Sequence, residues 1–413
     1  MSSLTPRCNL ERLAQAMRAR DIEGLVVTQP YNVYYLSGFN ATAHKSDEPR
    51  PYAVLLSRRA PDQPVLIVAD YYLASLLTRP SWIADIRPFR AVMMPLDLAP
   101  SAADIERFIP ERGGDAAWVG NARGKYAFDM GTSVKGALAD LGLQGAKLGF
   151  DDVGYGLRLG IGSDRLRDAY DCLMDARAIK TPTELRALEQ ASALNEKAIR
   201  KTIAGWDPAM SWADLTRVYG EAALSLGGFV RDPGGMVWGH PPGDDPAIML
   251  QTGAEQHKVA AGSNVMFDCH GTLELYCWDG GKTWVAGGEP TKLAQRHAKA
   301  TAAVAEDLLA AMRPGARVSA LQARARASYR KAGHPNADET VIFFHGLGLS
   351  HMDIPIAQAD GRPNSDWALE ENMVVPMHLL CPGGAAERWW LEEVVHVTAS
   401  GGRPLFSWGF DPL

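Results

Sequence analysis

Val265-Met266-Phe267-Asp268 and Tyr276-Cys277-Trp278-Asp279 are two short apolar runs that each end in an aspartate, and the two aspartates lie eleven residues apart. If the chain turns between Leu273 and Glu274, a β-hairpin places Asp268 directly opposite Asp279, with Cβ atoms about 5 Å apart on one face. Two carboxylates at that distance repel each other unless a positive charge lies between them, and a divalent metal ion would supply it. Spacing alone favours a solvated hairpin, because aspartate is common beside turns.

Three later motifs add candidate ligands. His345 opens His345-Gly346-Leu347-Gly348, where the glycines remove side-chain bulk and let the imidazole approach a ligand. His378 lies inside an apolar, strand-like run over residues 373–380. Glu392 and Glu393 open a β-branched run, and at least one of them must face inward if both faces of that strand are covered. Taken singly, each motif is more typical of ordinary turn or strand residues than of a metal site.

The pattern of the chain predicts two domains, since 413 residues exceed one ordinary core. Helix and strand signals alternate over the first third, which predicts an α/β domain at residues 1–165. A second domain at residues 175–413 begins with a helix that Thr181 caps, with Pro182 at its first position and Glu184 completing a capping box. Further helices over 291–312 and 318–331 are separated from hairpin-like strands, which predicts an α+β domain with a curved antiparallel sheet.

In this order, the motifs resemble the "pita-bread" superfamily of methionine aminopeptidase, prolidase, aminopeptidase P and creatinase. The resemblance includes a domain start like residues 178–185, the paired aspartates, the His-Gly-x-Gly motif and the acidic pair, of which Glu392 is the ligand. Residues 30–39 resemble the creatinase and prolidase N-terminal domain. The resemblance implies an α/β N-terminal domain, an α+β pita-bread catalytic domain and a metal site of Asp268, Asp279, His345, His378 and Glu392.

Three positions depart from the peptidases of that superfamily. His378 stands where they have a glutamate ligand, Met352 and Asp353 stand where they have a His-Glu pair, and Trp390 stands where they have an arginine. The usual site offers four carboxylates, whereas this chain offers three and two neutral imidazoles. We therefore expect one or two divalent transition-metal ions, because imidazole favours iron, zinc or cobalt over magnesium; manganese stays a further option. The alternative is a site without metal, as in creatinase, which lacks the paired aspartates.

Loss of the peptidase histidine at Met352 leaves its catalytic role to another group, since methionine cannot donate a proton. The candidates for this role are His351, His270, His257 and His240. Trp278, Trp390 and Asp353 are candidate substrate-binding residues, because tryptophans near the ligands could face a cationic substrate. Ordinary core or rim packing is the simpler interpretation for any single tryptophan.

Composition excludes several partners. A net charge of −6 gives no basic excess for binding nucleic acid, and no apolar run approaches the ~20 residues that span a bilayer. Five scattered cysteines without a CxxC pair, and no secretion signal, favour a cytoplasmic protein. The resemblance further implies a homodimer.

These observations predict a metal-dependent hydrolase that cleaves a C–N bond in a small charged metabolite. Relatives of this fold that left peptide chemistry, such as creatinase, ectoine hydrolase and a dimethylsulfoniopropionate lyase, act on such compounds. The alternatives are an Xaa-Pro aminopeptidase or dipeptidase with altered metal ligands, a lyase of the dimethylsulfoniopropionate-lyase type and a catalytically inactive binding module.

Overall fold

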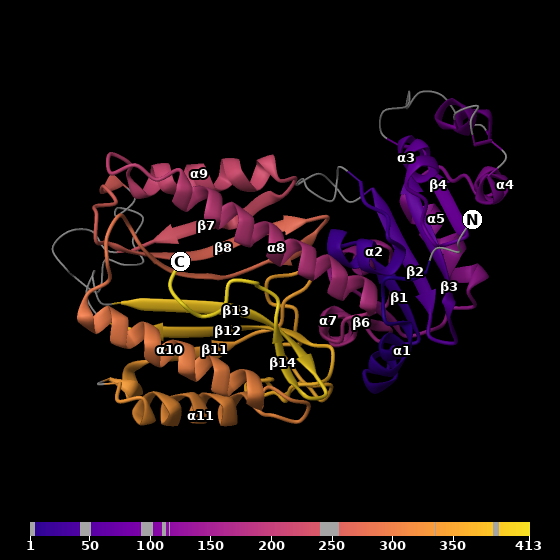
Figure 1. Ribbon diagram of the computed structural model, residues 1–413. Coiled ribbons are helices and arrows are strands. Elements are labelled where there is room, and N and C mark those ends of the chain that lie inside the picture. Colours follow the sequence, from indigo (N-terminus) through magenta and orange to yellow (C-terminus); the bar gives the residue numbers. More distant parts are fainter. Residues whose placement is uncertain are drawn as a thin grey trace. The chain divides into compact units, whose positions relative to one another are not determined.

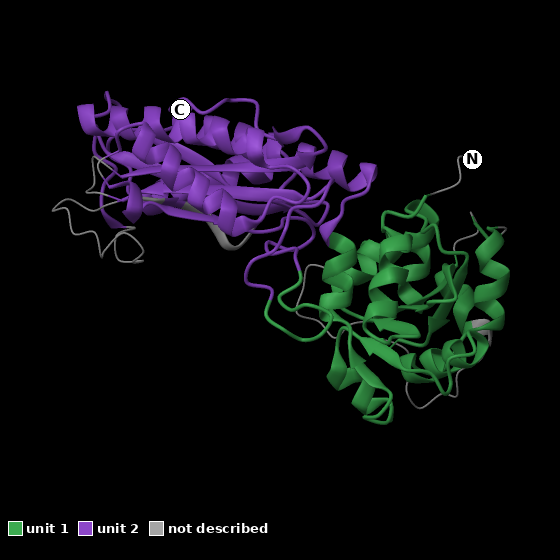
Figure 2. Cartoon of the chain, turned by 90° about the horizontal axis from the view of Figure 1, so that it is seen from below, with its two compact units in different colours: residues 1–177, 355–363 green, residues 178–354, 364–413 purple. Residues whose placement is uncertain are grey.

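The structure is a computed structural model that describes residues 5–41, 51–91, 102–109, 113–114, 116–239, 256–334, 336–382 and 388–413. The chain forms two compact units, residues 1–177 with 355–363 and residues 178–354 with 364–413 (Figure 2). The short segment 355–363 therefore belongs to the first unit although the second unit surrounds it in sequence.

The first unit is built on a six-stranded mixed sheet in the order β4-β3-β2-β1-β5-β6. The pairs β1–β2 and β2–β3 are antiparallel, and the other pairs are parallel. Its strands are β1 Gly24–Val27, β2 Tyr52–Ser57, β3 Ala60–Ala69, β4 Asp85–Phe89, β5 Leu148–Phe150 and β6 Leu166–Asp168. Its helices are α1 Leu10–Ala19, α2 Pro30–Ser37, α3 Leu73–Thr78, α4 Ala117–Gly124, α5 Met130–Asp140, α6 Val153–Arg158 and α7 Tyr170–Ala178. This arrangement confirms the predicted α/β fold.

The second unit is an antiparallel sheet in the order β11-β12-β13-β10-β8-β7, with β9 paired to β8 and β14 to β13. Its strands are β7 Phe229–Trp238, β8 Asn264–Leu273, β9 Tyr276–Trp278, β10 Gly281–Val285, β11 Val341–Phe344, β12 Val374–Cys381, β13 Trp389–Thr398 and β14 Gly401–Pro404. Its α-helices are α8 Pro182–Ala204, α9 Trp212–Ser225, α10 Lys292–Ala311 and α11 Val318–Lys331. The helices α8 and α9 lie along β7 and β8, and α10 and α11 lie along β11 to β13 (Figure 1).

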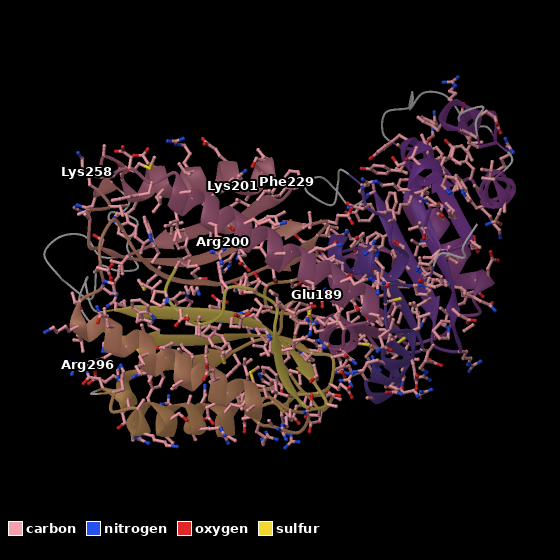
Figure 3. The ribbon with its side chains drawn as sticks, in the orientation of Figure 1. Glu189, Arg200, Lys201, Phe229, Lys258 and Arg296 are labelled. Atoms are coloured by element: carbon pink, nitrogen blue, oxygen red, sulfur yellow. The ribbon has the colours of Figure 1, made fainter. Side chains whose placement is uncertain are left out.

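Helix α8 begins as its local sequence predicts. The side chain of Thr181 accepts a hydrogen bond from the N–H of Glu184, and Glu184 Oε2 accepts one from the N–H of Thr181 at 2.9 Å. Leu188 and Ile199 are buried on its inner face. Arg200 and Lys201 lie on the exposed face, with Glu189 half-buried nearer the start of the helix (Figure 3). A capped amphipathic helix is thus set beside the central strands.

The hairpin between β8 and β9 is shifted by two residues from the predicted pairing. Leu273 pairs with Tyr276, so the turn residues are Glu274 and Leu275, whose φ angles are 48° and 73°. Continued along the strands, this register sets Asp279 opposite His270 and not opposite Asp268. The prediction failed because two-residue turns with positive φ usually carry Asn or Gly, and neither is present.

All five cysteines are free and buried. Among the described residues, none of the helices is long and apolar enough to cross a membrane.

Candidate metal centre

Seven side chains of the second unit form one continuous group, here called the central cluster. Three overlapping sets each bring their ligand atoms within 4.8 Å of one another. The sets are His270–Asp279–His351, Asp268–Asp279–Glu392 and His345–His378–Glu392. Because Asp279 and Glu392 each belong to two sets, the three sets are joined. The structure therefore brings together all five residues predicted as ligands, and it adds His270 and His351.

Strand geometry explains this convergence. Asp268 and His270 lie two residues apart on β8 and so point to the same face. His378 on β12 and Glu392 on β13 are directly paired in the sheet. The neighbouring Glu393 points to the other face, where its Oε1 accepts a hydrogen bond from the N–H of Phe406 at 3.1 Å. The acidic pair is thus divided between the two faces, and Glu392 faces the cluster.

His270 lies between the two aspartates. Its Nε2 is 2.9 Å from Oδ1 of Asp268 and 3.2 Å from Oδ1 of Asp279. Burial alone would lower the pKa of His270, but the hydrogen bond to Asp268 and the charges of both aspartates outweigh it and raise the pKa. Without a metal ion, the raised pKa favours the protonated imidazole, whose positive charge would lie between the two carboxylates.

Several histidine nitrogens of the cluster lie close to carboxylate oxygens of Asp279 and Glu392 without a hydrogen bond between them. His351 Nε2 and His345 Nε2 lie 3.0 and 3.4 Å from Oδ2 of Asp279, and His378 Nε2 lies 3.2 Å from Oε1 of Glu392. All of these atoms are buried and lack a hydrogen-bond partner among the described residues. Buried polar atoms normally have partners, so this pattern fits lone pairs directed at a common ion.

The pKa shifts within the cluster also fit a bound metal ion. Burial, together with the charges of Asp279 and Asp268, raises the pKa of Glu392 well above its ordinary value. Burial also raises the pKa of Asp279, but contact with His351 and the charges of His270 and His345 outweigh it and bring the pKa below its ordinary value. Burial lowers the pKa of His345 and of His378, which keeps both imidazoles neutral. Neutral imidazole is the form that binds metal.

The donor set fits a divalent transition-metal ion. His345, His378 and Glu392 together offer two imidazoles and one carboxylate, and His270, His351 and Asp279 offer the same combination. Such sets suit iron, zinc or cobalt better than magnesium or calcium. The His345 ring is also oriented, since its Nδ1 lies 3.0 Å from the carbonyl oxygen of Gly346 and Nε2 is left for the ion.

The chain matches two known protein families. Residues 186–399 match the profile of Metallopeptidase family M24, and residues 9–153 match the Creatinase/Prolidase N-terminal domain. The chain belongs to Metallopeptidase family M24. With its N-terminal domain and its whole-chain likenesses, it is a member of the pita-bread superfamily of creatinase, prolidase and aminopeptidase P.

Solved structures of this superfamily resemble the whole chain at low sequence identity. An X-Pro aminopeptidase from Thermotoga maritima has a TM-score of 0.69 at 17% identity, covering 97% of this chain and 99% of that one. An Xaa-Pro dipeptidase from Bacillus anthracis has a TM-score of 0.67 at 17% identity, covering 98% of each chain. The dipeptidase PepE from Mycobacterium ulcerans has a TM-score of 0.63 at 21% identity, covering 98% of this chain and 96% of that one. These likenesses show the fold. No curated protein sequence matches the chain.

Two substrate-binding predictions for this M24 member are wrong. Trp278 is fully buried in the core between the sheet and α8 and α9, and its Nε1 donates a hydrogen bond to the hydroxyl of Tyr219 at 2.8 Å. It points away from the cluster because strand alternation sends it to the face opposite Asp279. Asp353 is also buried, and its Oδ2 lies 3.5 Å from Nζ of the fully buried Lys180. Its charge is therefore engaged inside the protein.

One of the candidate catalytic histidines, His257, does not join the cluster in the described structure. His257 is exposed, and its backbone carbonyl accepts a hydrogen bond from the N–H of Trp212. Among the described residues, no interaction connects its side chain to the central cluster, so this prediction finds no support. His240 lies outside the described residues.

The buried pair Lys180–Asp353 supports the histidine motif, and sequence patterns did not reveal it. The N–H of Asp353 donates a hydrogen bond to the carbonyl of Gly346 at 2.9 Å. A Cβ atom at Gly348 would overlap the Asp353 carboxylate, so the glycine is required there. Lys180 and Asp353 lie 173 residues apart in sequence. Such a contact has no local signature, although the glycines of the motif do indicate close packing.

Aromatic rings flank His378. Phe343 stacks on it with ring centroids 3.7 Å apart, and Trp390 meets it edge-on at 5.5 Å. Phe343 is partly exposed, whereas Trp390 is buried. Phe343 was not predicted as a site residue. It lies on β11 two residues before His345, and residues two apart in an extended chain point to the same side, which could have suggested it.

Proposed function

We propose that this member of family M24 is a metal-dependent hydrolase that cleaves a C–N bond in a small charged metabolite. The observation that carries the proposal is the composition of the central cluster. Histidine stands at position 378, where the peptidases of the superfamily use a carboxylate, and four imidazoles accompany only three carboxylates. A cluster with fewer negative charges suits a substrate that brings its own charge to the site.

The proposed roles follow from position. Asp268, Asp279, His345, His378 and Glu392 would hold one or two divalent transition-metal ions. When bound, such an ion supplies Lewis acidity and an activated water for hydrolysis. His351 is the proposed proton carrier, because its side chain is 42% exposed while its Nε2 lies beside Asp279. A ring with one buried and one accessible side can pass a proton between solvent and the reacting group.

His270 has the role of a positioning residue in this proposal. Its Nε2 lies within 3.2 Å of an oxygen of each aspartate, so it fixes the separation of Asp268 and Asp279. Bound metal would compete with the His270 proton for the same carboxylate oxygens. His270 therefore either joins the ligands as a neutral imidazole or gives way to the ion.

The aromatic rings beside His378 support a compact, charged substrate. Phe343 presents a partly exposed ring next to the cluster, and an aromatic face attracts a cationic group. A zwitterionic metabolite could place its cationic end against such a ring and its carboxylate against the metal. Trp390 is proposed to shape the same side of the site.

Proline peptides fit the cluster less well. Met352 is 49% exposed at the position where the peptidases have a histidine, and it can neither donate a proton nor stabilise an oxyanion. The names of the similar structures nevertheless make Xaa-Pro dipeptidase or aminopeptidase activity the second candidate. Both functions share a metal requirement, so substrate choice distinguishes them.

The test compares Ala-Pro and Gly-Pro peptides with betaines, cyclic amidines and N-substituted amino acids, each assayed with iron, manganese, zinc and cobalt. We expect turnover of a small charged compound that disappears in Asp279→Asn, and weak or absent cleavage of proline peptides. Efficient proline-peptide cleavage that disappears in Asp279→Asn and is unchanged in His378→Glu would favour the second candidate. No turnover of either substrate class with any metal would favour a binding module.

We also propose a cytoplasmic homodimer, because closed two-fold dimers are the commonest assembly. Light scattering at micromolar concentration tests the assembly, and a monomeric mass would contradict it.

A further inference from the structure

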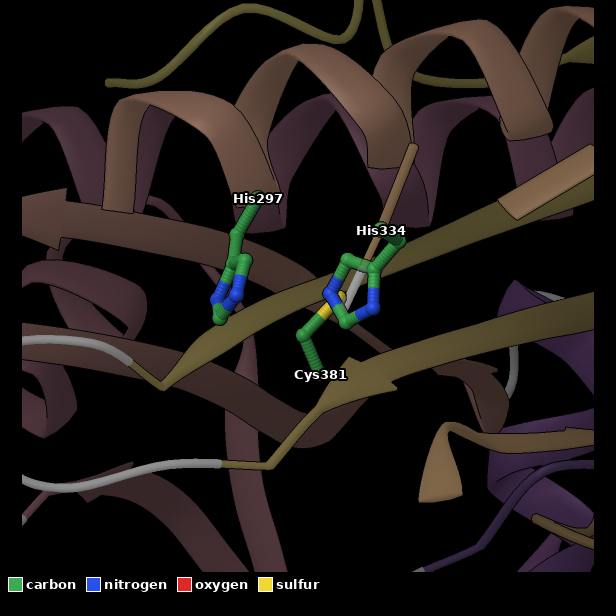
Figure 4. Close-up of side chains that lie close together, drawn as sticks. All are labelled: His297, His334 and Cys381. Atoms are coloured by element: carbon green, nitrogen blue, oxygen red, sulfur yellow. The ribbon is translucent and has the colours of Figure 1, made fainter. Parts of the chain in front are cut away.

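A second buried group of metal-binding side chains lies in the same unit and shares no residue with the central cluster. It consists of His297 on α10, His334 just after α11 and Cys381 at the end of β12 (Figure 4). One ligand atom from each residue lies within 4.8 Å of the other two. The exposed fractions are 3%, 7% and 0%, and the two imidazole rings lie 4.5 Å apart.

Strand alternation separates this group from the central cluster. His378 and Cys381 are three residues apart on β12, so they point to opposite faces of the sheet. Cys381 belongs to the apolar core under α10 and α11, together with Tyr329, Ala325 and Ala337. The second group therefore faces that core through Cys381.

His334 has an unused nitrogen directed into the group. Its Nδ1 accepts a hydrogen bond from the N–H of Asn336 at 3.2 Å, while its buried Nε2 has no hydrogen-bond partner in the described part of the chain. Figure 4 shows this second nitrogen on the side of the ring that faces Cys381. A buried ring nitrogen without a partner carries a desolvation cost that a bound ion would remove.

The protonation states suit ligands once an ion is present. Burial and the neighbouring His297 lower the pKa of His334 to about 4, so the ring is neutral at physiological pH. Burial raises the pKa of the Cys381 thiol to about 11, against smaller lowering by Thr301 and Tyr329. Without an ion the Cys381 thiol and the His334 ring are therefore uncharged, which an apolar core tolerates.

We propose that Cys381, His297 and His334 form a buried structural site for one thiophilic metal ion, Cu⁺ or Zn²⁺. Thiolate and imidazole are the ligands that these ions prefer. Binding transfers the Cys381 proton to solvent and forms a metal–sulfur bond. It also moves the His334 ring proton from Nε2 to Nδ1, which breaks the hydrogen bond from Asn336.

Charge balance predicts the order of affinity. One thiolate and two neutral imidazoles neutralise Cu⁺, whereas Zn²⁺ would leave one positive charge in an apolar core. The described residues add no carboxylate to the group. The hydroxyl of Thr301 lies 3.4 Å from Sγ of Cys381 and could occupy a fourth position. We therefore expect Cu⁺ to bind more tightly than Zn²⁺.

Cobalt(II) provides an optical test on the full chain. After treatment with a chelator, the protein is titrated with Co²⁺ and the near-ultraviolet thiolate-to-cobalt charge-transfer band is recorded. The central cluster contains no thiolate, so its occupation gives no such band. We expect the band in the wild type and in Asp279→Asn, and its loss in Cys381→Ser and in His334→Gln. Cys172→Ser, which changes another fully buried thiol in the other unit, is the matched control.

Anaerobic titrations with Cu⁺ and with Zn²⁺ give a second readout, because an ion that binds the folded chain raises the midpoint of thermal unfolding. That midpoint should rise in Asp279→Asn and not in Asp279→Asn/Cys381→Ser. His334→Gln serves if Cys381→Ser fails to fold. A wild type without the cobalt band, or a band that persists in Cys381→Ser, would overturn the proposal. Neither result touches the proposed hydrolase activity, which depends on Asp279.

Discussion

The central cluster and the His297–His334–Cys381 group are built on opposite faces of β12, and they differ in charge. The central cluster holds three carboxylates, and in two of them the pKa values are driven apart, with that of Glu392 raised and that of Asp279 lowered. In the other group, burial keeps the Cys381 thiol and the His334 ring uncharged. The first arrangement needs a positive charge between its carboxylates, from His270 or from an ion, whereas the second can exist with or without an ion. Closeness of ligands is therefore a weaker sign of a required metal than unbalanced charge.

Removing a charge from the central cluster is the change expected to have the largest effect. In Asp279→Asn, the oxygen shared by His345 and His351 loses its charge, and both metal content and activity should fall. We expect kcat/KM to drop by more than about 100-fold, since even loss of a partner behind the ligands can cost that much. Enzyme assays with metal analysis measure it. Asp338→Asn, at an exposed carboxylate, is the control, and full metal content in Asp279→Asn would contradict the comparison.

The buried Lys180–Asp353 pair, which packs against the His345–Gly348 motif, gives the second prediction. Lys180→Met leaves the Asp353 carboxylate buried beside Gly348 without its ion-pair partner. The expected loss in the free energy of unfolding is about 3–5 kcal/mol. Denaturant unfolding checks it, with Lys197→Met on the exposed face of α8 as the matched control. Equal stability of the two variants would contradict a stabilising role for this ion pair.

Glu184 lies near the Lys180–Asp353 pair, and its protonation should make the stability of the chain depend on pH. Burial raises its pKa from 4.5 to about 7, although hydrogen bonds with Thr181 and the charge of Lys180 oppose the shift. Between those values the folded chain holds a proton that the unfolded chain has released, so stability falls as pH rises. The slope is at most about 1.4 kcal/mol per pH unit. Thermal unfolding between pH 4.5 and 7 should show a shallower slope in Glu184→Gln, and an unchanged slope would contradict the assignment.

A change in the His297–His334–Cys381 group should have the smallest effect on stability and activity when no metal is added. Cys381→Ala removes one small buried group from the core, which costs about 1 kcal/mol of stability. Activity should stay at the wild-type level, because Cys381 faces away from the central cluster. Parallel measurements of unfolding and of kcat/KM test this. A loss of activity as large as that in Asp279→Asn would show that the two groups are coupled.

Sequence predicts the features of this chain that are local. The start of α8 depends on Thr181, Pro182 and Glu184, which lie within one helical turn, and the structure has the predicted capping box. The two-unit organisation was also predictable from the length of the chain, and the α/β and antiparallel α+β folds from the order of helix and strand signals. In the N-terminal unit, for example, the fully buried strand Gly24–Val27 is an uninterrupted apolar run after its first residue.

The parts that failed depend on contacts between distant residues or on an unusual turn. The hairpin register required Glu274 and Leu275 to adopt positive φ, which their types do not indicate. Asp353 was assigned to substrate because its partner Lys180 lies far away in sequence. Trp278 could have been assigned to the core, since it is adjacent to Asp279 in a strand and alternation separates neighbouring side chains.

The central claim is that nitrogen ligands from His345 and His378 share the metal with carboxylates. X-ray absorption on zinc- or cobalt-loaded protein measures this most directly, in the Cys381→Ser variant so that only the central cluster contributes. We predict a ligand shell of nitrogen and oxygen with outer-shell scattering from imidazole, which weakens when His378→Ala is added. An all-oxygen shell, or an imidazole signal that is unchanged in His378→Ala, would contradict the claim.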